Sequence, residues 1–147
     1  MKSAVLFLIF NRPDTTSVAF ERIREVQPPK LYIAADGPRA NKDGDVEKCA
    51  RTRDIVRNID WECEVKTLFR DTNLGCGKGV SSAITWFFEN EEEGIIIEDD
   101  IIPHPDFFKY CDEMLERYRH DARIQLIAGR NAFYEGYNSE YSYYMSS

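Results

Sequence analysis

The stretch that decides the fold class is residues 94–108, which read GIIIEDDIIPHPDFF. Three isoleucines, Ile95–Ile97, are followed directly by Glu98, Asp99 and Asp100. An uninterrupted apolar run is typical of a strand buried on both faces, as in a parallel sheet. Three adjacent carboxylates repel one another, so they are unfavourable at the end of a core strand unless a ligand binds there. The stretch therefore predicts a buried strand that ends in a polar crevice.

The three acids allow two interpretations. Mg²⁺ and Mn²⁺ are hard cations that take oxygen ligands, so a bound cation would relieve the repulsion. If the strand continues through the acids, Glu98 and Asp100 face one side of the sheet and Asp99 faces the other. Alternatively, the acids complement the dipole of the following helix. Because residues 101–105 separate them from that helix, metal or ligand binding is the favoured interpretation.

Strand and helix patterns alternate along the rest of the chain. Strands are expected at Ala4–Phe10, Leu31–Ala35, Cys63–Phe69, residues 94–98 and Ile124–Ala128. Helices are expected over about 15–26 with Asp14 as the cap, over Val46–Ile59, over about 80–90 and from Pro105 to about Arg119. The apolar residues expected to face inward from the first three helices are Val18, Ala19, Ile23, Val26, Val46, Cys49, Ile55, Val56, Ile59, Val80, Ala83, Ile84, Phe87 and Phe88. This alternation predicts an α/β fold, with an open, mostly parallel sheet and helices on both faces.

Composition narrows the class of protein. The 147 residues suggest one domain over residues 1–130, followed by a Tyr-rich tail over 131–147. The net charge of −7 argues against a nucleic-acid partner. Four scattered cysteines are expected to be reduced thiols of a cytoplasmic protein, or of one peripheral to the inner face of the membrane. No apolar run is long enough for a transmembrane segment.

Parallel sheets bind ligands beyond the carboxyl ends of their strands, and polar residues follow each of the first two predicted strands. Asn11 and Arg12 come after the first strand, and Asp36 comes after the second. The Arg12 guanidinium suits a base carbonyl or a phosphate, although a surface Arg also pairs with nearby carboxylates. Asp36 could accept hydrogen bonds from a uracil or a ribose, although an Asp before Gly and Pro is also a common turn residue.

A glycine-containing loop, NLGCGKG, covers Asn73–Gly79 before an expected helix. Glycines such as Gly75 let a backbone approach a phosphate closely, and Lys78 adds positive charge near a helix N-terminus. The loop has neither a complete Walker A pattern nor a GxGxxG pattern, so taken alone it is weak support for nucleotide binding.

Taken together, these segments resemble the GT-A fold of nucleotide-diphospho-sugar glycosyltransferases, a Rossmann-like α/β fold. The nearest resemblance is to the N-acetylglucosaminyltransferase I type and its uncharacterised bacterial relatives. It covers about residues 4–130 and depends on Asn11–Arg12, Asp36–Gly37, Asn73–Gly75 and above all on IIIEDD followed by Pro105–Phe108. The acidic triplet corresponds in that family to a variant of the Asp-x-Asp motif.

The resemblance implies a role for each candidate residue. Asp100 would bind Mn²⁺ or Mg²⁺, which bridges the donor diphosphate, while Glu98 and Asp99 would contact the donor ribose and sugar. Arg12 and Asp36 would hold the uridine of a UDP-sugar. The sugar would pass with inversion to an unknown glycan or other hydroxyl acceptor. The remaining donor-binding candidates are Asn11, Gly75 and Lys78.

The family's catalytic domain continues into an acceptor region that contains the general base, and neither is recognisable in this sequence. The tail over 131–147 is expected to be the start of that missing region, and it offers a surface for a homo-oligomer. The principal alternative to a glycosyltransferase is a non-catalytic nucleotide-sugar-binding module. A sugar-nucleotide pyrophosphorylase ranks lower, because its GxGxR–Pro–Lys signature is missing near the N-terminus.

Overall fold

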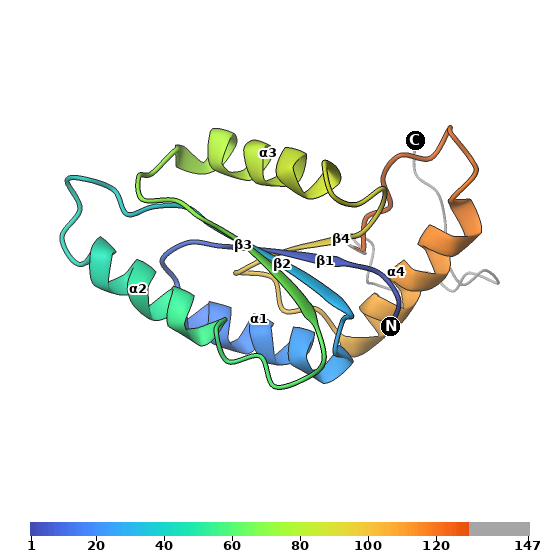
Figure 1. Ribbon diagram of the computed structural model, residues 1–147, viewed down its shortest axis with the longest axis horizontal. Helices are drawn as coiled ribbons and strands as arrows, with labels where there is room; N and C mark the ends of the chain where they lie inside the picture. Colours follow the sequence, from blue (N-terminus) through green and yellow to red (C-terminus); the bar gives the residue numbers. More distant parts are fainter. Residues whose placement is uncertain (130–147) are drawn as a thin grey trace, which may run out of the picture.

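The computed structural model describes residues 1–129 and contains a four-stranded, all-parallel open sheet in the order β3-β2-β1-β4 (Figure 1). The strands are β1 (Val5–Ile9), β2 (Lys30–Ala35), β3 (Glu64–Phe69) and β4 (Ile95–Glu98). The helices are α1 (Pro13–Val26), α2 (Asp45–Ile55), α3 (Gly75–Phe88) and α4 (Pro105–Tyr118). The predicted α/β class and parallel sheet are therefore confirmed.

Helices cover both faces of the sheet, as predicted (Figure 1). On one face, α1 and α4 contribute Phe20, Ile23 and Phe108, and the residue that ends α2 contributes Val56, to a core with alternate residues of the strands. On the other face, α3 is the only helix among residues 1–129. The two central strands, β1 and β2, are therefore buried on both sides, which explains why they are uninterrupted apolar runs, whereas the edge strand β3 is largely exposed.

The strand order reverses at β1. The chain proceeds from β1 outward through β2 to β3, and then crosses the sheet so that β4 pairs with the free side of β1. Right-handed crossovers place α1 and α2 on one face and α3 on the other, because the two directions of travel require opposite faces. The junction of β1 and β4 is therefore the topological switch point, where open α/β sheets bind ligands.

Two helix starts differ from prediction. α1 begins at Pro13 with Arg12 as its N-cap, and Asp14 lies in the first turn instead of capping the helix. Proline is favoured at the first helical position because its φ is already helical and its missing N–H is not needed there. α3 begins at Gly75 instead of residue 80, so most of the predicted glycine loop is helical.

Some expected inward residues are exposed. Val18, Val46 and Phe88 lie on the outer surface, with 44%, 63% and 45% of their area exposed. The buried positions of α1 include Thr16 and Phe20 instead of Val18. Apolar periodicity does not distinguish neighbouring faces of a short helix, so the packing of α1 against the sheet decided which face is covered.

The fifth strand predicted at Ile124–Ala128 is not formed, since these residues belong to no strand or helix. Leu126 is 84% exposed. Ile and Leu favour strands only when a neighbouring strand and a packed face are available to them.

Within residues 1–129, no helix is long and apolar enough to cross a membrane. The expected Tyr-rich tail, with the acceptor region and homo-oligomer surface assigned to it, lies outside the described residues.

Candidate functional site

Strand register brings the candidate residues to one edge of the sheet. Leu8 of β1 is the partner of Glu98 in β4, and Ile9 is the partner of Ala35 in β2. The segments that follow all three strands therefore emerge side by side. One hydrogen bond holds β1 to the acids, since the Phe10 N–H donates to Asp99 Oδ2 at 2.9 Å. The structure thus groups the strand-end residues as the sequence predicted.

Arg12 reaches across the switch point to the acids after β4. Its Nη1 lies 2.5 Å from Asp100 Oδ2 and 3.4 Å from Asp99 Oδ1. The hydrogen bond with Asp100 and the charge of Asp99 raise the pKa of Arg12, so the guanidinium remains charged. The side chains of Arg12 and Asp100 are about half exposed, whereas that of Asp99 is buried. The surface pairing that the sequence allowed for Arg12 is therefore the one observed.

Asp99 is the buried member of the acidic triplet. The strand ends at Glu98, and the next two residues lie in a turn. Exposure nevertheless alternates, because Glu98 and Asp100 are exposed and Asp99 between them is buried. Burial raises the pKa of Asp99, while the Phe10 N–H and the charge of Arg12 act in the opposite direction. The carboxylate of Asp99 is thus directed into the protein, where it joins β4 to β1.

The Thr16 hydroxyl adds a polar atom behind the acids. Thr16 is completely buried in α1, and its Oγ1 makes no hydrogen bond of normal geometry. The hydroxyl nevertheless lies near enough to Asp99 to lower the pKa of that carboxyl. The buried carboxylate of Asp99 is therefore the polar group that faces this hydroxyl.

The acids after β4 offer too few ligands to hold a cation without additional oxygen ligands. Within residues 1–129, no three His, Cys, Asp or Glu side chains are grouped to hold a metal ion by themselves. Mg²⁺ characteristically keeps waters and binds through one or two carboxylates plus substrate phosphates. Asp100 supplies such a carboxylate, because only Oδ2 is engaged by Arg12.

Asp36 lies at the end of β2 and holds the start of α3. Its carboxylate accepts hydrogen bonds from the N–H groups of Gly37, Leu74 and Gly75 and from Asn73 Nδ2, at 3.0–3.1 Å. A carboxylate has about four acceptor positions, so these donors fill it. An anion at this position also stabilises the positive end of the helix dipole. Asp36 therefore explains why α3 begins earlier than its glycines suggest.

The glycine-containing segment Asn73–Gly79 is thus organised around the carboxylate of Asp36. Gly75 adopts a left-handed φ of 79°, and its N–H points to Asp36 Oδ2. A Cβ on Gly79 would lie 3.1 Å from Asp36 Oδ2, so the missing side chain makes room for that carboxylate. Lys78 lies exposed in the first turn of α3.

A second buried carboxylate, Asp45, was missed in the sequence. Only 2% of its area is exposed, and it accepts hydrogen bonds from Asn11 Nδ2 and from the backbone and guanidinium of Arg39. The bonds from Arg39 keep the pKa of Asp45 well below its usual range. Asp45 thereby fixes Asn11, which precedes Arg12 in the chain. An acid at a helix start is common, so no local pattern distinguished it.

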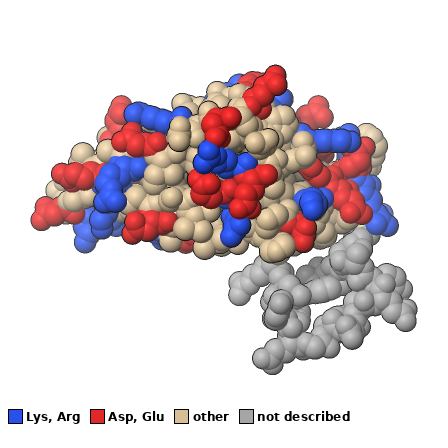
Figure 2. Space-filling model, turned by 90° about the horizontal axis from the view of Figure 1, so that it is seen from below, with Lys and Arg blue, Asp and Glu red and all other residues tan. Residues whose placement is uncertain are grey.

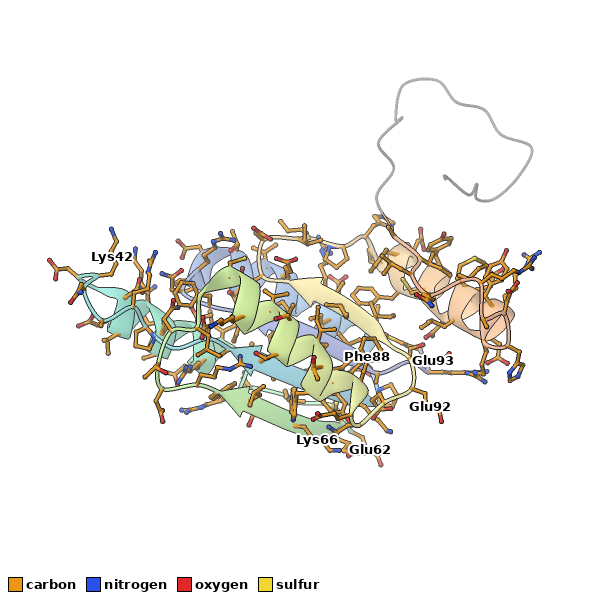
Figure 3. The ribbon with its side chains drawn as sticks, turned by 90° about the horizontal axis from the view of Figure 1, so that it is seen from above. Lys42, Glu62, Lys66, Phe88, Glu92 and Glu93 are labelled. Carbon is orange, nitrogen blue, oxygen red and sulfur yellow. The ribbon has the colours of Figure 1, made fainter. Side chains whose placement is uncertain are left out.

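Other charged residues lie away from this edge. Figure 3 shows Lys42, from the loop after β2, at one end of the molecule, and it shows Glu62, Lys66, Phe88, Glu92 and Glu93 well apart from it, around the start of β3 and the end of α3. Figure 2 shows acidic and basic side chains interspersed on the face seen there. A hollow between α1 and α2 is lined by Pro13, Asp14, Ser17, Arg51, Asp54 and Ile55. None of the acids after β4 lines it.

Comparison with known proteins leaves the site to be interpreted from its own geometry. No protein-family model matches the chain, and no curated protein matches it.

Proposed function

We propose that the chain binds a UDP-sugar with Mn²⁺ or Mg²⁺ at the carboxyl edge of its sheet, as a metal-dependent glycosyltransferase of the GT-A type or the donor-binding portion of one. The observation that carries this proposal is the meeting of Arg12, Asp99 and Asp100 at the switch point between β1 and β4. Ligands of open α/β sheets bind at that position. Exposed carboxylate oxygens beside a guanidinium suit a metal-bound diphosphate.

In this proposal, Asp100 would hold the cation and Glu98 would face the donor ribose and sugar, while the buried Asp99 would position Arg12 and the β1 terminus. The nucleotide would be held at the β1 terminus by Arg12, which follows Asn11, and by the segment with Gly75 and Lys78. Because protein donors fill the Asp36 carboxylate, Asp36 would act by holding that segment in place and would not contact the uridine directly. The cation would supply positive charge that stabilises the leaving diphosphate. The sugar then passes to a hydroxyl group of the acceptor.

Transfer also needs a base within hydrogen-bond reach of the acceptor hydroxyl. Among the described carboxylates near this edge, Asp36, Asp45 and Asp99 accept hydrogen bonds from the protein, and this proposal assigns the exposed Glu98 and Asp100 to the donor and the cation. This observation favours a second candidate function, a nucleotide-sugar-binding module without transfer activity. The two functions share the donor site and differ only in turnover.

The test is a thermal-shift panel of UDP-sugars and other nucleotide sugars, with Mn²⁺ and with EDTA. A ligand that binds only the folded state stabilises it by about 2.7 kcal/mol at a hundred times its Kd. We expect a rise in Tm that requires both the UDP-sugar and Mn²⁺. Unchanged Tm with every nucleotide sugar, at concentrations up to the millimolar range, would refute the proposal.

Two variants localise the binding. Asp100→Asn should abolish the Mn²⁺-dependent shift, whereas Asp54→Asn, at an exposed acid of α2, should leave it intact. Hydrolysis or transfer of the bound UDP-sugar then separates the candidates, because the binding module predicts affinity without turnover.

A further inference from the structure

We infer that β3 is a dimer interface, at which its free edge pairs in antiparallel orientation with the β3 of a second copy of this chain. Among residues 1–129, β3 pairs with β2 alone, so its other side is an open edge of the sheet. Figure 3 shows β3 along the outer border of the sheet. An open edge is a template on which another strand can pair. The interface is separate from the ligand site proposed at the carboxyl ends of the strands.

The backbone of β3 directs hydrogen-bonding groups to its free side. The N–H groups of Glu64 and Arg70, at the start of β3 and just beyond its end, both donate toward the β2 side. In a parallel pair, successive residues of a strand direct their N–H and C=O groups alternately to the two sides. The groups that point away from β2 therefore belong to Val65, Thr67 and Phe69.

The lysine of β3 does not block this edge. Edge strands are commonly protected by a charged side chain, especially a lysine. Here Lys66 lies over the sheet, because its Nζ is 5.3 Å from the centre of the Tyr32 ring and 3.0 Å from Asn90 Oδ1. On the opposite face of the strand, Val65 is 40% exposed. A second strand paired at this edge would cover Val65 without displacing Lys66 from its contacts.

The order of residues in the strand identifies a second copy as the partner. An antiparallel pair with its two-fold axis at Thr67 places the two Thr67 residues opposite each other. It also places Glu64 opposite Arg70 of the second copy, and Val65 opposite Phe69 of that copy. Opposite charges, Thr–Thr pairs and aromatic–β-branched pairs are cross-strand combinations that stabilise a sheet. The stretch from residue 64 to residue 70 is therefore complementary to its own reversed copy.

Other registers of the same pair are less favourable. An axis between two residues opposes backbone groups that point toward the partner to groups that point away from it, so the ladder cannot form. An axis at Lys66 opposes two lysines, and an axis at Leu68 opposes Lys66 to Arg70, and like charges directly opposite each other are destabilising. An axis at Val65 places the last residues of β3 opposite residues outside the strand. The axis at Thr67 pairs the whole strand.

The expected dimer is a weak one. Pairing along one strand buries less than about 1,200 Å², the lower limit for a stable interface, so we expect a dimer that dissociates on dilution, with a Kd on the order of 10–100 μM. Sedimentation velocity across that range of concentration measures the Kd without any ligand.

The decisive experiment exchanges the charges at the two ends of β3. Glu64→Arg and Arg70→Glu each oppose like charges at both ends of the pair, and each should raise the Kd by about tenfold. The double variant restores opposite charges and should return the Kd to within about threefold of the parental value. Glu64 is about half exposed, and Arg70 bonds to Ser82 at the surface, so neither change enters the core. Within one chain the two positions lie about 20 Å apart along the strand, so this rescue reports a contact between copies.

Asp43→Arg is the matched control for net charge. Asp43 is an exposed acid in the loop between β2 and α2, and its reversal changes the net charge as much as Glu64→Arg does. The Kd of this variant should differ from the parental value by less than about twofold, because the Debye length of about 10 Å at 0.1 M salt screens charges outside the interface.

Amide hydrogen exchange, followed by NMR at low and high protein concentration, locates the interface in the parent chain. The amides of Val65, Thr67 and Phe69 should exchange more slowly at high concentration, because pairing gives them acceptors. Those of Lys66 and Leu68, which point toward β2, should change little. This measurement decides the question if either charge variant fails to fold.

Three results would overturn the inference. They are a parent chain that stays monomeric at roughly tenfold above the expected Kd, a dimer without added protection at those three amides, and a double variant as weak as the single ones. None of these results bears on the proposed function, since no ligand is present. A failure of nucleotide-sugar binding would equally leave the interface unaffected.

Discussion

The carboxylates on the β2 side of the β1 terminus and those on the β4 side differ in how completely protein donors occupy their acceptor positions. Asp36 and Asp45 are surrounded by protein donors that fill their acceptor positions. Asp100, after β4, meets only the Nη1 of Arg12 and remains about half exposed. A filled carboxylate holds the fold together, whereas a partly filled and exposed one can exchange its partner for a ligand. One edge of the sheet therefore has a rigid half and an exchangeable half.

This difference has a physical basis in burial. Removing one partner from a buried pair leaves an uncompensated charge or an unsatisfied donor, which is strongly destabilising. Removing an exposed partner costs little, because water replaces it. Substitutions on the two sides should therefore separate folding from ligand binding.

The largest effect on folding is expected from Asp45→Ala. It leaves Asn11 Nδ2 and the Arg39 donors without their acceptor, and detaches the start of α2 from the end of β1. We expect Tm to fall by about 5–10 °C. Differential scanning calorimetry measures the change, with Asp54→Ala as the exposed-acid control in the same helix. A shift of less than 2 °C would contradict the assignment of Asp45 to the rigid half.

The stabilisation from Asp45 should also depend on pH. Because its folded pKa lies below the ordinary value of 3.8, the unfolded chain takes up a proton at Asp45 before the folded protein does. The stabilisation should be complete well above pH 3.8 and should decline as the pH falls further below that value. Urea denaturation of the parent and of Asp45→Asn between pH 7 and pH 3 measures this. A constant difference in stability below pH 3.8 would contradict it.

Asp36→Ala should have an intermediate effect. It removes the acceptor for the amides of Leu74 and Gly75 at the start of α3. Loss of a helix cap costs about 1–2 kcal/mol. Hydrogen exchange should accelerate first in residues 74–79, while the amides of β1 remain protected. Uniform acceleration across the sheet would instead place Asp36 in the global core.

The smallest effect on folding is expected from Asp100→Asn. Its single ion pair is half exposed, so we expect a change in unfolding free energy within about 0.5 kcal/mol. Its Mn²⁺-dependent affinity for UDP should nevertheless fall by more than about tenfold, since charge-assisted contacts contribute about 1.5–3 kcal/mol. Calorimetry on the folded variant checks both expectations. Unchanged affinity would remove Asp100 from the site.

The amino-acid sequence by itself determined the parallel sheet and the grouping of polar residues at its edge. The apolar runs Val5–Ile9, Leu31–Ala35 and Ile95–Ile97 have no polar alternation, and only burial on both faces suits them. Polar residues come directly after Ala35 and Ile97 and, in the first run, after Phe10, and parallel strands bring their carboxyl ends together. Arg12, Asp36 and the acids after Ile97 were therefore predictable as neighbours.

Only the tertiary structure decided which of these neighbours bond to one another. Asp36 caps a helix that starts about 39 residues later in the chain, and Asp45 accepts a hydrogen bond from Asn11, 34 residues away. The run Ile124–Ala128 has the composition of a strand but does not form one. Local propensity is a property of consecutive residues, whereas burial, capping and strand pairing depend on contacts between distant ones. Contacts between distant residues also decide whether protein donors fill a carboxylate or leave it able to exchange its partner.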